Sequence, residues 1–212
     1  FRQGDKGKPS RIDPSQIDQI LANLCVNARD AIQEGGKIVI ETGLKFFDEV
    51  YCSQHAGVVP GEYMVLAVKD NGCGMTYETI EKVRDPFVTT RTTRRVGLGI
   101  PLMEMNAVRT GGYLDIESQV GKGTSLTAVF QHSHLDRPPL GDIASTVKVL
   151  LMVNPELDLR YRHTLDDRAF MVTTRELQEI LGGIPLTQPE VLEWLDQSLP
   201  EGIAHLYGGA KS

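Results

Sequence analysis

The chain of 212 residues has few cysteines, no excess of basic residues and no long apolar run. Its three cysteines, Cys25, Cys52 and Cys73, are too few and too far apart for a disulfide framework or a zinc site, and they fit a reducing cytosol. A net charge of -6 argues against a nucleic-acid surface, which needs a basic stripe. No apolar run approaches the roughly 18 residues that a membrane-spanning helix needs.

The composition that is present, 41% hydrophobic and 24% charged, is typical of a soluble globular protein. The length suits one large domain or two small ones. Because the chain begins at Phe1 rather than Met, we expect a fragment of a longer protein, and an upstream membrane anchor stays open. His132 and His134 could bind a metal, but such a pair without further ligands is more typical of a solvated surface.

Hydrophobic periodicity and turn residues predict an alternation of helices and strands. Helices are expected over 13–32, 77–84, 100–110, 143–152, 175–181 and 189–199, and strands over 37–42, 63–69, 113–118, 124–131, 157–161 and 169–173. Asp13 and Pro14 suit the start of the first helix, as cap and first helical residue. Arg137-Pro138-Pro139 marks a break, which predicts two domains, 1–136 and 137–212.

Polar residues gather on one flank of the first expected helix. At 100° per residue, its apolar stripe consists of Ile17, Ile20, Leu21, Leu24, Ala28 and Ala31. Asn23, Asn27 and Asp30 fall together beside this stripe. A carboxamide oxygen there can hold Mg²⁺, which takes few protein ligands besides phosphates and water. Taken alone, the pattern favours an ordinary amphipathic helix with a solvated flank.

A glycine-rich turn follows the expected strand that ends at Asp70. A carboxylate at a strand end can accept a hydrogen bond from the exocyclic amine of adenine. Gly72 and Gly74 let the backbone turn and approach a base closely, because they lack a side chain. Asp-Asn-Gly is also strong turn chemistry, so a plain turn is the alternative. Met75 in the same loop, and the preceding Asn-rich helix, favour the adenine site.

Gly97 and Gly99 directly precede a helix that opens at Ile100-Pro101. The free amides and dipole at a helix amino terminus bind phosphate well. The signal is weakly specific, because neither the GxGxxG fingerprint nor the GK[ST] of a P-loop is present. A polar stretch upstream, from Thr89 to Arg95, could close over a triphosphate, and a solvated loop explains each arginine equally well.

Four segments together resemble the histidine-kinase branch of the ATPase superfamily that includes gyrase, the heat-shock chaperone ATPases and the mismatch-repair ATPase. NLCVNARDA resembles the N box, DNGCGM the G1 box, DPFVTT the F box and GLGI the G2 box. GKGTSLTAVF resembles the closing strand, so the resemblance covers residues 13–131. It implies an α/β two-layer sandwich of the Bergerat type, a mixed sheet with helices on one face, to which the tail adds a small α+β extension.

Carried over by position, the resemblance implies a site for ATP and Mg²⁺. Asn27 would bind magnesium, and Asp70 would bind the adenine amine. The other positions implied to line the pocket, shape the adenine loop, begin the lid or meet the phosphates are Asn23, Asp30, Ala31, Gly72, Gly74, Met75, Thr89, Thr90, Gly97, Leu98, Gly99 and Thr124. No residue is assigned a catalytic role.

Three departures from the family pattern refine this expectation. Asn23 stands where the hydrolytic relatives have a glutamate that activates water, so phosphoryl transfer is expected rather than rapid hydrolysis. None of the five histidines lies in a segment that resembles the phospho-acceptor helix, so the chain should not phosphorylate itself in cis. Few residues separate DPFVTT from GLGI, which implies a short lid.

The resemblance therefore implies the ATP-binding catalytic domain of a cytoplasmic two-component sensor histidine kinase. Its partners would be a separate dimerisation segment with the acceptor histidine and a downstream response regulator, without nucleic acid or membrane contact by this segment. The alternative is a standalone ATP-responsive protein-binding module without kinase activity. The tail is similar, more weakly, to small standalone bacterial ATP-binding proteins, some associated with hydrogenase gene clusters. A natural mosaic and an engineered chimera are both open.

Two features of the tail are expected to be structural. Charged residues crowd the two adjacent expected strands near 157–161 and 169–173, namely Arg160, Arg162, His163, Asp166 and Asp167; they could form a docking face, but the pattern is more typical of a solvated hairpin with cross-strand ion pairs. Trp194 shares an expected helix with apolar residues, which favours core packing over a partner contact.

Overall fold

A computed structural model describes residues 14–32, 35–55, 57–86, 99–137 and 142–208. Its centre is a six-stranded mixed sheet with the strand order β3-β4-β2-β1-β5-β6. The strands are β1 (Lys37–Phe47), β2 (Gly61–Asp70), β3 (Tyr113–Gln119), β4 (Gly123–Gln131), β5 (Asp158–Leu165) and β6 (Arg168–Thr173). Only the pair β1–β5 is parallel, and the other neighbouring strands run antiparallel.

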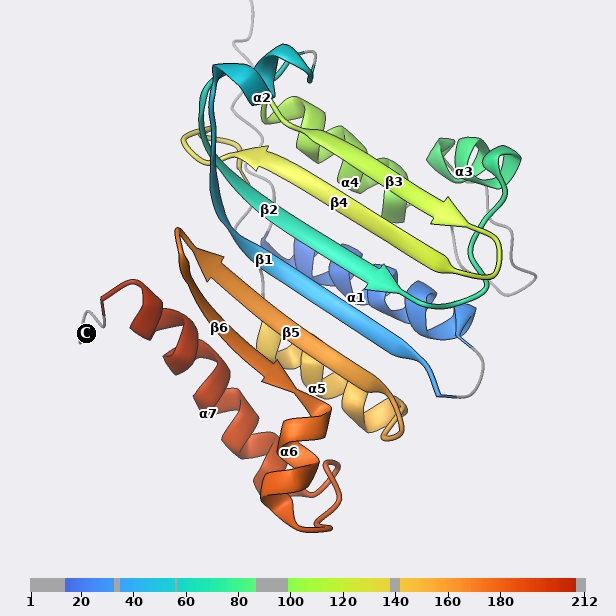
Figure 1. The fold of residues 1–212 in the computed structure, drawn as a ribbon, viewed down its shortest axis with the longest axis vertical. Coiled ribbons are helices and arrows are strands. Elements are labelled where there is room, and N and C mark those ends of the chain that lie inside the picture. Colours follow the sequence, from blue (N-terminus) through green and yellow to red (C-terminus); the bar gives the residue numbers. More distant parts are fainter. Residues whose placement is uncertain (1–13, 33–34, 56, 87–98, 138–141, 209–212) are drawn as a thin grey trace, which may run out of the picture.

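Helices cover one face of this sheet. They are α1 (Pro14–Ala31), α3 (Tyr77–Arg84), α4 (Gly99–Arg109), α5 (Ile143–Val153), α6 (Thr174–Leu181) and α7 (Pro189–Leu206), whereas the short helix α2 (Glu49–Ser53) packs in a separate cluster on the opposite face, with Tyr63 and Val129. In Figure 1, α1, α4 and α5 lie behind the strands, and α7 runs beside β6 at the edge of the sheet. The α/β two-layer architecture expected from the sequence is thereby confirmed.

The alternation of side chains along β1 explains why one face is covered. Ile38 and Ile40 are fully buried against the helices, as a period of two requires. Glu41 points to the opposite face, where its carboxylate lies 2.5 Å from the Lys69 ammonium. Burying one large aliphatic side chain on the covered face stabilises the fold by about 2 kcal/mol.

The C-terminal extension continues the same sheet. Strand β5 pairs with β1, and Leu159 lies opposite Ile38. One hydrophobic core cluster contains Leu21 of α1, Met103 of α4 and Leu195 of α7. The division that we expected at residue 136 stays a prediction, and the described parts on either side of it share one sheet and one core.

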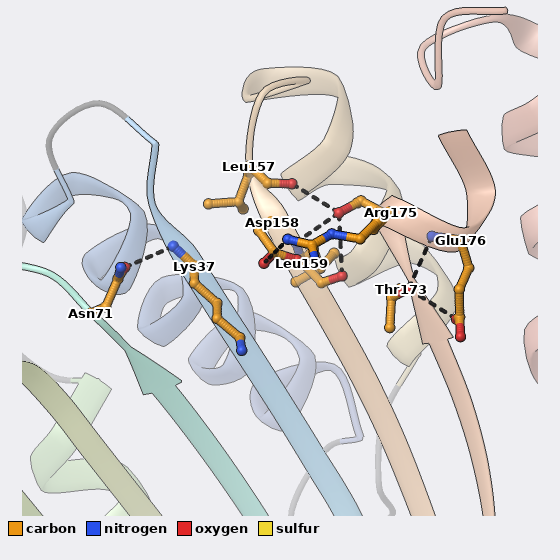
Figure 2. A network of polar contacts seen from close by, with 9 residues as sticks. Lys37, Asn71, Leu157, Asp158, Leu159, Thr173, Arg175 and Glu176 are labelled. Carbon is orange, nitrogen blue, oxygen red and sulfur yellow. Dashed lines mark hydrogen bonds and ion pairs between the residues drawn. The ribbon is translucent and has the colours of Figure 1, made fainter. Parts of the chain in front are cut away.

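Side chains of α6 hold the start of β5 in place (Figure 2). The Thr174 hydroxyl donates to the carbonyl oxygen of Leu157 at 3.1 Å and accepts from the Leu159 amide at 3.0 Å. A guanidinium nitrogen of Arg175 lies 3.9 Å from the Asp158 carboxylate. Such an exposed ion pair contributes less than about 1 kcal/mol, so the buried hydroxyl is the stronger tie.

Most expected elements are present, with differences at their ends. Strand β1 continues to Phe47, and α7 continues to Leu206 through Pro200. The short helix α2 was not predicted, because only five residues form it, held by the Asp48 carboxylate, which accepts from the Tyr51 amide. The expected cap Asp13 lies outside the described residues.

Two expectations about the tail are wrong. Trp194 is 49% exposed, because the buried stripe of α7 runs through Val191, Leu195 and Leu199 at four-residue spacing. His163 is buried rather than solvated, because it lies on the same face of β5 as Tyr161, beneath the helices.

Among the described residues, no helix is both long and apolar enough to cross a membrane.

Candidate nucleotide-binding site

Helix α1 presents the expected polar flank beside its buried face. Its buried residues include Ile20, Leu21, Leu24, Cys25 and Ala28. Asn23 is exposed and Asn27 is half-buried. The Asp30 carboxylate accepts hydrogen bonds from Nε of Arg29 at 2.8 Å and from its Nη2 at 2.5 Å. The flank therefore offers a carboxamide at the margin of the core and a carboxylate whose charge is already balanced.

Asp70 ends β2 with its carboxylate held by the backbone. Its Oδ1 accepts from the Gly72 amide at 2.8 Å, and the Thr124 amide also hydrogen-bonds this carboxylate. Burial raises the pKa of Asp70 above its usual 3.8, and the two backbone hydrogen bonds partly oppose that shift. A carboxylate has about four lone-pair positions, so two amide donors leave room for an amine of a ligand.

The loop after Asp70 packs backbone to backbone against the end of α1. The Cys73 amide donates to the carbonyl oxygen of Ala31 at 2.8 Å. A Cβ on Gly72 would lie 2.5 Å from that same oxygen. Only glycine allows this approach, which explains its requirement at position 72 and brings Ala31 to the site.

The turn between β3 and β4 closes against the other side of the loop. Gly74 has φ +66°, and a Cβ there would lie 2.0 Å from the carbonyl oxygen of Gln119. Gly123 has φ +109°, and its Cβ would lie 2.0 Å from the carbonyl oxygen of Asp70. The Gly121 amide donates to the Cys73 carbonyl at 2.8 Å. Loop and hairpin therefore interlock through glycines.

Asn71 ties the loop to a third element. Its side-chain oxygen accepts from the Lys37 amide at 2.7 Å, at the start of β1 (Figure 2). The Asn71 amide in turn donates to the Lys37 carbonyl at 3.3 Å. The loop is consequently held by α1, by the β3–β4 turn and by β1.

The amino terminus of α4 lies beside the polar flank of α1. A Cβ on Gly99 would lie 3.9 Å from the Cβ of Asn23. The first amides of α4 have no partners within the helix, so they are suited to binding phosphate oxygens. Arg84 of α3 and Glu104 of α4 form an ion pair that holds these two helices together. The expected lid residues Thr89 and Thr90, as well as Gly97 and Leu98 and the basic stretch from Arg91 to Arg95, lie outside the described residues.

The structure thus brings many of the expected site residues into three contacts: Ala31 with Gly72, Asp70 with Thr124, and Asn23 with Gly99. Asn71, Ser118 and Gly123 also hold the site together, although their role was not predicted from the sequence. Gly123 carried a signal, since it belongs to the closing-strand segment, whereas Ser118 carried none. Magnesium binding by Asn27 stays a prediction.

The histidines considered as metal ligands have separate partners. His132 Nδ1 lies 3.5 Å from the Glu62 carboxylate, and His134 Nδ1 accepts from the Asp136 amide at 3.1 Å. Within the described ranges, no group of three His, Cys, Asp or Glu side chains could hold a metal ion. A magnesium ion bound mainly through nucleotide phosphates does not need such a group.

A carboxylate at a strand end, a loop interlocked through glycines and a helix amino terminus beside a polar flank form the arrangement that the sequence predicts for a nucleotide-binding α/β sandwich. The comparison with protein families agrees: residues 12–134, more than half of the chain, match the model described as histidine kinase-, DNA gyrase B-, and HSP90-like ATPase. The chain belongs to this family. It is accordingly an ATP-binding domain of the type expected from the four boxes.

Several curated relatives are kinases. The chain is 29% identical to "Sensor kinase CckA" of Brucella abortus (strain 2308), over 82% of this chain and 21% of that protein. It is 28% identical to "Sporulation kinase E" of Bacillus subtilis (strain 168), over 55% of this chain and 14% of the relative. It is 31% identical to "Signal transduction histidine-protein kinase AtoS" of Escherichia coli (strain K12), over 57% of this chain and 17% of that relative. The chain therefore spans less than a quarter of the length of these relatives, and the Brucella match extends beyond residues 12–134.

Proposed function

We propose that this chain is the catalytic domain of a two-component sensor histidine kinase, which holds Mg-ATP while its γ-phosphate passes to a histidine on a separate dimerisation segment. The observation that carries the proposal is the Asp70 carboxylate, oriented by two backbone amides at the end of a strand. The named relatives support the kinase part, because the three described above are all called kinases. A cytoplasmic location and a response regulator downstream belong to the same proposal.

In this proposal each residue binds or positions the nucleotide. The Asp70 carboxylate accepts from the adenine amine, and the backbone of Gly72 and Gly74 lies against the base. The first amides of α4, at Gly99, face the phosphates. The half-buried carboxamide of Asn27 fits a magnesium ligand, because Mg²⁺ takes a single protein oxygen beside phosphates and water. Magnesium would supply charge neutralisation on the transferring phosphoryl group.

The site favours transfer over hydrolysis, because Asn23 stands where the hydrolytic relatives have a glutamate that activates water. Asn23 has a carboxamide, which does not accept a proton near neutral pH. The carboxylate of Asp30 is engaged by the Arg29 guanidinium, which donates two hydrogen bonds to it. Catalysis would consist of positioning and charge neutralisation, which is how phosphoryl transfer is promoted in general.

Calorimetry with Mg-ATP tests the nucleotide site. We expect wild-type binding and a loss of about 10- to 100-fold in Asp70→Ala, since a hydrogen bond to a charged group contributes about 1.5–3 kcal/mol. The matched control is Asp167→Ala, an exposed carboxylate in the turn between β5 and β6, which should bind as the wild type does. No binding by a folded wild type would refute the proposal.

A second experiment separates the kinase from a module that only responds to ATP. The chain is incubated with radiolabelled Mg-ATP and a separately purified histidine-containing dimerisation segment of a sensor kinase. Acid-labile label on that segment, absent with Asp70→Ala, is the expected result. Binding without transfer to any tested acceptor would favour the ATP-responsive module.

A further inference from the structure

Ser118, near the end of β3, lies at the junction of the two sides of the adenine loop. Its Oγ accepts a hydrogen bond at 2.8 Å from the amide of Met75, the last residue of the loop. Its hydroxyl donates to the carbonyl oxygen of Gly123 at 3.0 Å. The Oγ1 of Thr124, directly opposite in the sheet, lies 2.9 Å away.

These three contacts use the full capacity of the hydroxyl. A serine side chain has one proton to donate and two lone pairs to accept with. Since its proton is directed to Gly123, the Thr124 hydroxyl must be the donor in the contact with Ser118. The three hydrogen bonds are therefore mutually consistent, and each defines the orientation of the next.

The Ser118 hydroxyl is linked to the Asp70 carboxylate in two ways, along the loop and across the sheet. Along the loop, it holds Met75 and thereby the glycine backbone that follows Asp70. Across the sheet, it orients Thr124, whose amide hydrogen-bonds the Asp70 carboxylate, and Thr124 is the register partner of Asp70. A loop with two glycines has much conformational freedom to lose, so such a fixed point matters more there than in a regular strand.

We propose that Ser118 is a positioning residue of the nucleotide site, which holds the adenine loop and the Asp70 carboxylate in the geometry that binds ATP. The role rests on the proposed function, because it requires that nucleotide binds at Asp70. It predicts that loss of the hydroxyl weakens binding without disturbing the core. Ser118 is half-buried, whereas the core residues of β3 are Leu114 and Ile116.

Calorimetry with Mg-ATP and with Mg-ADP on four proteins tests this role: wild type, Ser118→Ala, Ser118→Thr and Ser125→Ala. We expect Ser118→Ala to bind both nucleotides about tenfold more weakly, and by the same factor, because the adenine end is common to both. Ser118→Thr retains the hydroxyl and should remain within about threefold of the wild type. Ser125 lies in the same hairpin and makes no side-chain hydrogen bond to a described residue, so its variant should be unchanged.

A second readout follows the loop itself. By nuclear magnetic resonance, the Met75 amide of Ser118→Ala should exchange with solvent faster than in the wild type, while the amides of β4 keep their protection. If Ser118→Ala does not fold, Ser118→Cys replaces it, since a thiol keeps the size but hydrogen-bonds weakly. Affinity losses in this variant should then follow the same pattern.

The outcomes are separable. If the wild type binds and Ser118→Ala binds equally well, the role of Ser118 is refuted while the nucleotide site stands. Equal losses in Ser118→Ala and Ser118→Thr would also refute it, because packing rather than the hydroxyl would then matter. No binding by the folded wild type would refute the proposed function and this role together.

Discussion

Two clusters of polar side chains lie on the helix-covered face of the sheet, and only one of them remains accessible. The first, which we call the loop cluster, consists of Asp70, Thr124 and Ser118, adjacent in register across β2, β4 and β3. All three are partly exposed. The Asp70 carboxylate is held by backbone amides, so its orientation is set without a side chain covering it.

The second, which we call the sealed cluster, consists of Thr42, Tyr161, His163 and Tyr207. The Thr42 hydroxyl lies 2.9 Å from the Tyr161 hydroxyl and 2.7 Å from His163 Nδ1. His163 Nε2 lies 3.1 Å from the hydroxyl of Tyr207, which follows α7. Thr42, Tyr161 and His163 are at most 3% exposed, so the groups satisfy each other and exclude water.

The difference between the clusters lies in what covers them. Tyr207, which follows α7 and is 49% exposed, lies against His163 at the outer side of the sealed cluster, whereas glycine backbone borders the loop cluster at Gly72, Gly74 and Gly123. Polar residues on a covered sheet face are therefore no indication of a site by themselves. Such polar residues indicate a site where the backbone supplies their hydrogen bonds and the neighbouring residues are glycines.

The largest expected effect comes from giving the loop cluster a side chain. In Gly72→Val the Cβ would lie 2.5 Å from the Ala31 carbonyl oxygen and 2.7 Å from its carbon, so the loop must move. A displacement of about 1 Å at a site can cost about 100-fold, and we expect calorimetry to detect no Mg-ATP binding. Gly182→Asn is the control, because this left-handed cap has open space and asparagine tolerates it. Retained binding in Gly72→Val would show that the close approach is dispensable.

The next effect separates stability from binding. His163→Ala removes the buried hydrogen bond to Thr42 and the part-buried one to Tyr207, and it leaves a space where the ring was packed, so the free energy of unfolding should fall by about 2–4 kcal/mol. Urea denaturation measures this, with the exposed neighbour Arg162→Ala expected within about 0.5 kcal/mol of the wild type. Mg-ATP affinity of the folded variant should not change. A parallel loss of affinity would mean that the two clusters are coupled.

The pKa shifts in the two clusters make stability depend on pH in opposite directions. Burial lowers the pKa of the His163 imidazole from its usual 6.5, so this group is neutral in the fold and protonated in the unfolded chain at mildly acidic pH. The stability that it contributes is present above pH 6.5 and is lost as the pH falls toward the folded pKa. Burial raises the pKa of Asp70 above 3.8, so the free domain loses stability as the pH rises through the interval between 3.8 and the folded pKa.

ATP affinity should follow the ionisation of Asp70. The adenine amine needs the ionised carboxylate, so affinity falls as the pH drops below the raised pKa, by about tenfold per pH unit. The ratio of wild-type to Asp70→Asn affinity removes the titration of the nucleotide itself. This ratio should decline at a higher pH than an ordinary aspartate would give. A decline centred at or below 3.8 would contradict the burial of this carboxylate.

The parts of the fold that were predictable have local signals. Hydrophobic periodicity and glycine turns predicted the strands and most helices, and the four boxes predicted that Asp70 and the glycine loop belong to one site. The parallel pairing of β5 with β1 was not predictable, because nothing near Leu159 indicates which strand it will join. The burial of His163 was missed for the same reason, since its partners Thr42 and Tyr207 are distant in sequence.

Ser118 shows the same limit inside the site. Its three hydrogen-bond partners come from the adenine loop and the opposite strand, so the serine has no local feature that separates it from Ser125 in the same hairpin. By contrast, Gly72 and Asp70 belong to a contiguous motif that carries its own chemistry. Motifs of contiguous residues were therefore predictable from the sequence, whereas the residues that hold them in place were visible only in the structure.

The smallest expected effect uses the cysteines as reporters of the two environments. Cys25 is buried in α1, and burial raises the pKa of its thiol to about 12, so it should react with a disulfide reagent only on unfolding. Cys73 is exposed in the adenine loop and should react readily. Saturating Mg-ATP should slow its labelling by about threefold to tenfold if bound nucleotide covers or rigidifies the loop. Cys52 near α2 is the internal control, with Cys52→Ser and Cys73→Ser assigning each kinetic phase. Equal protection of Cys52 and Cys73 would instead indicate a general stabilisation of the fold, and protection of neither would show that nucleotide leaves the loop cluster uncovered.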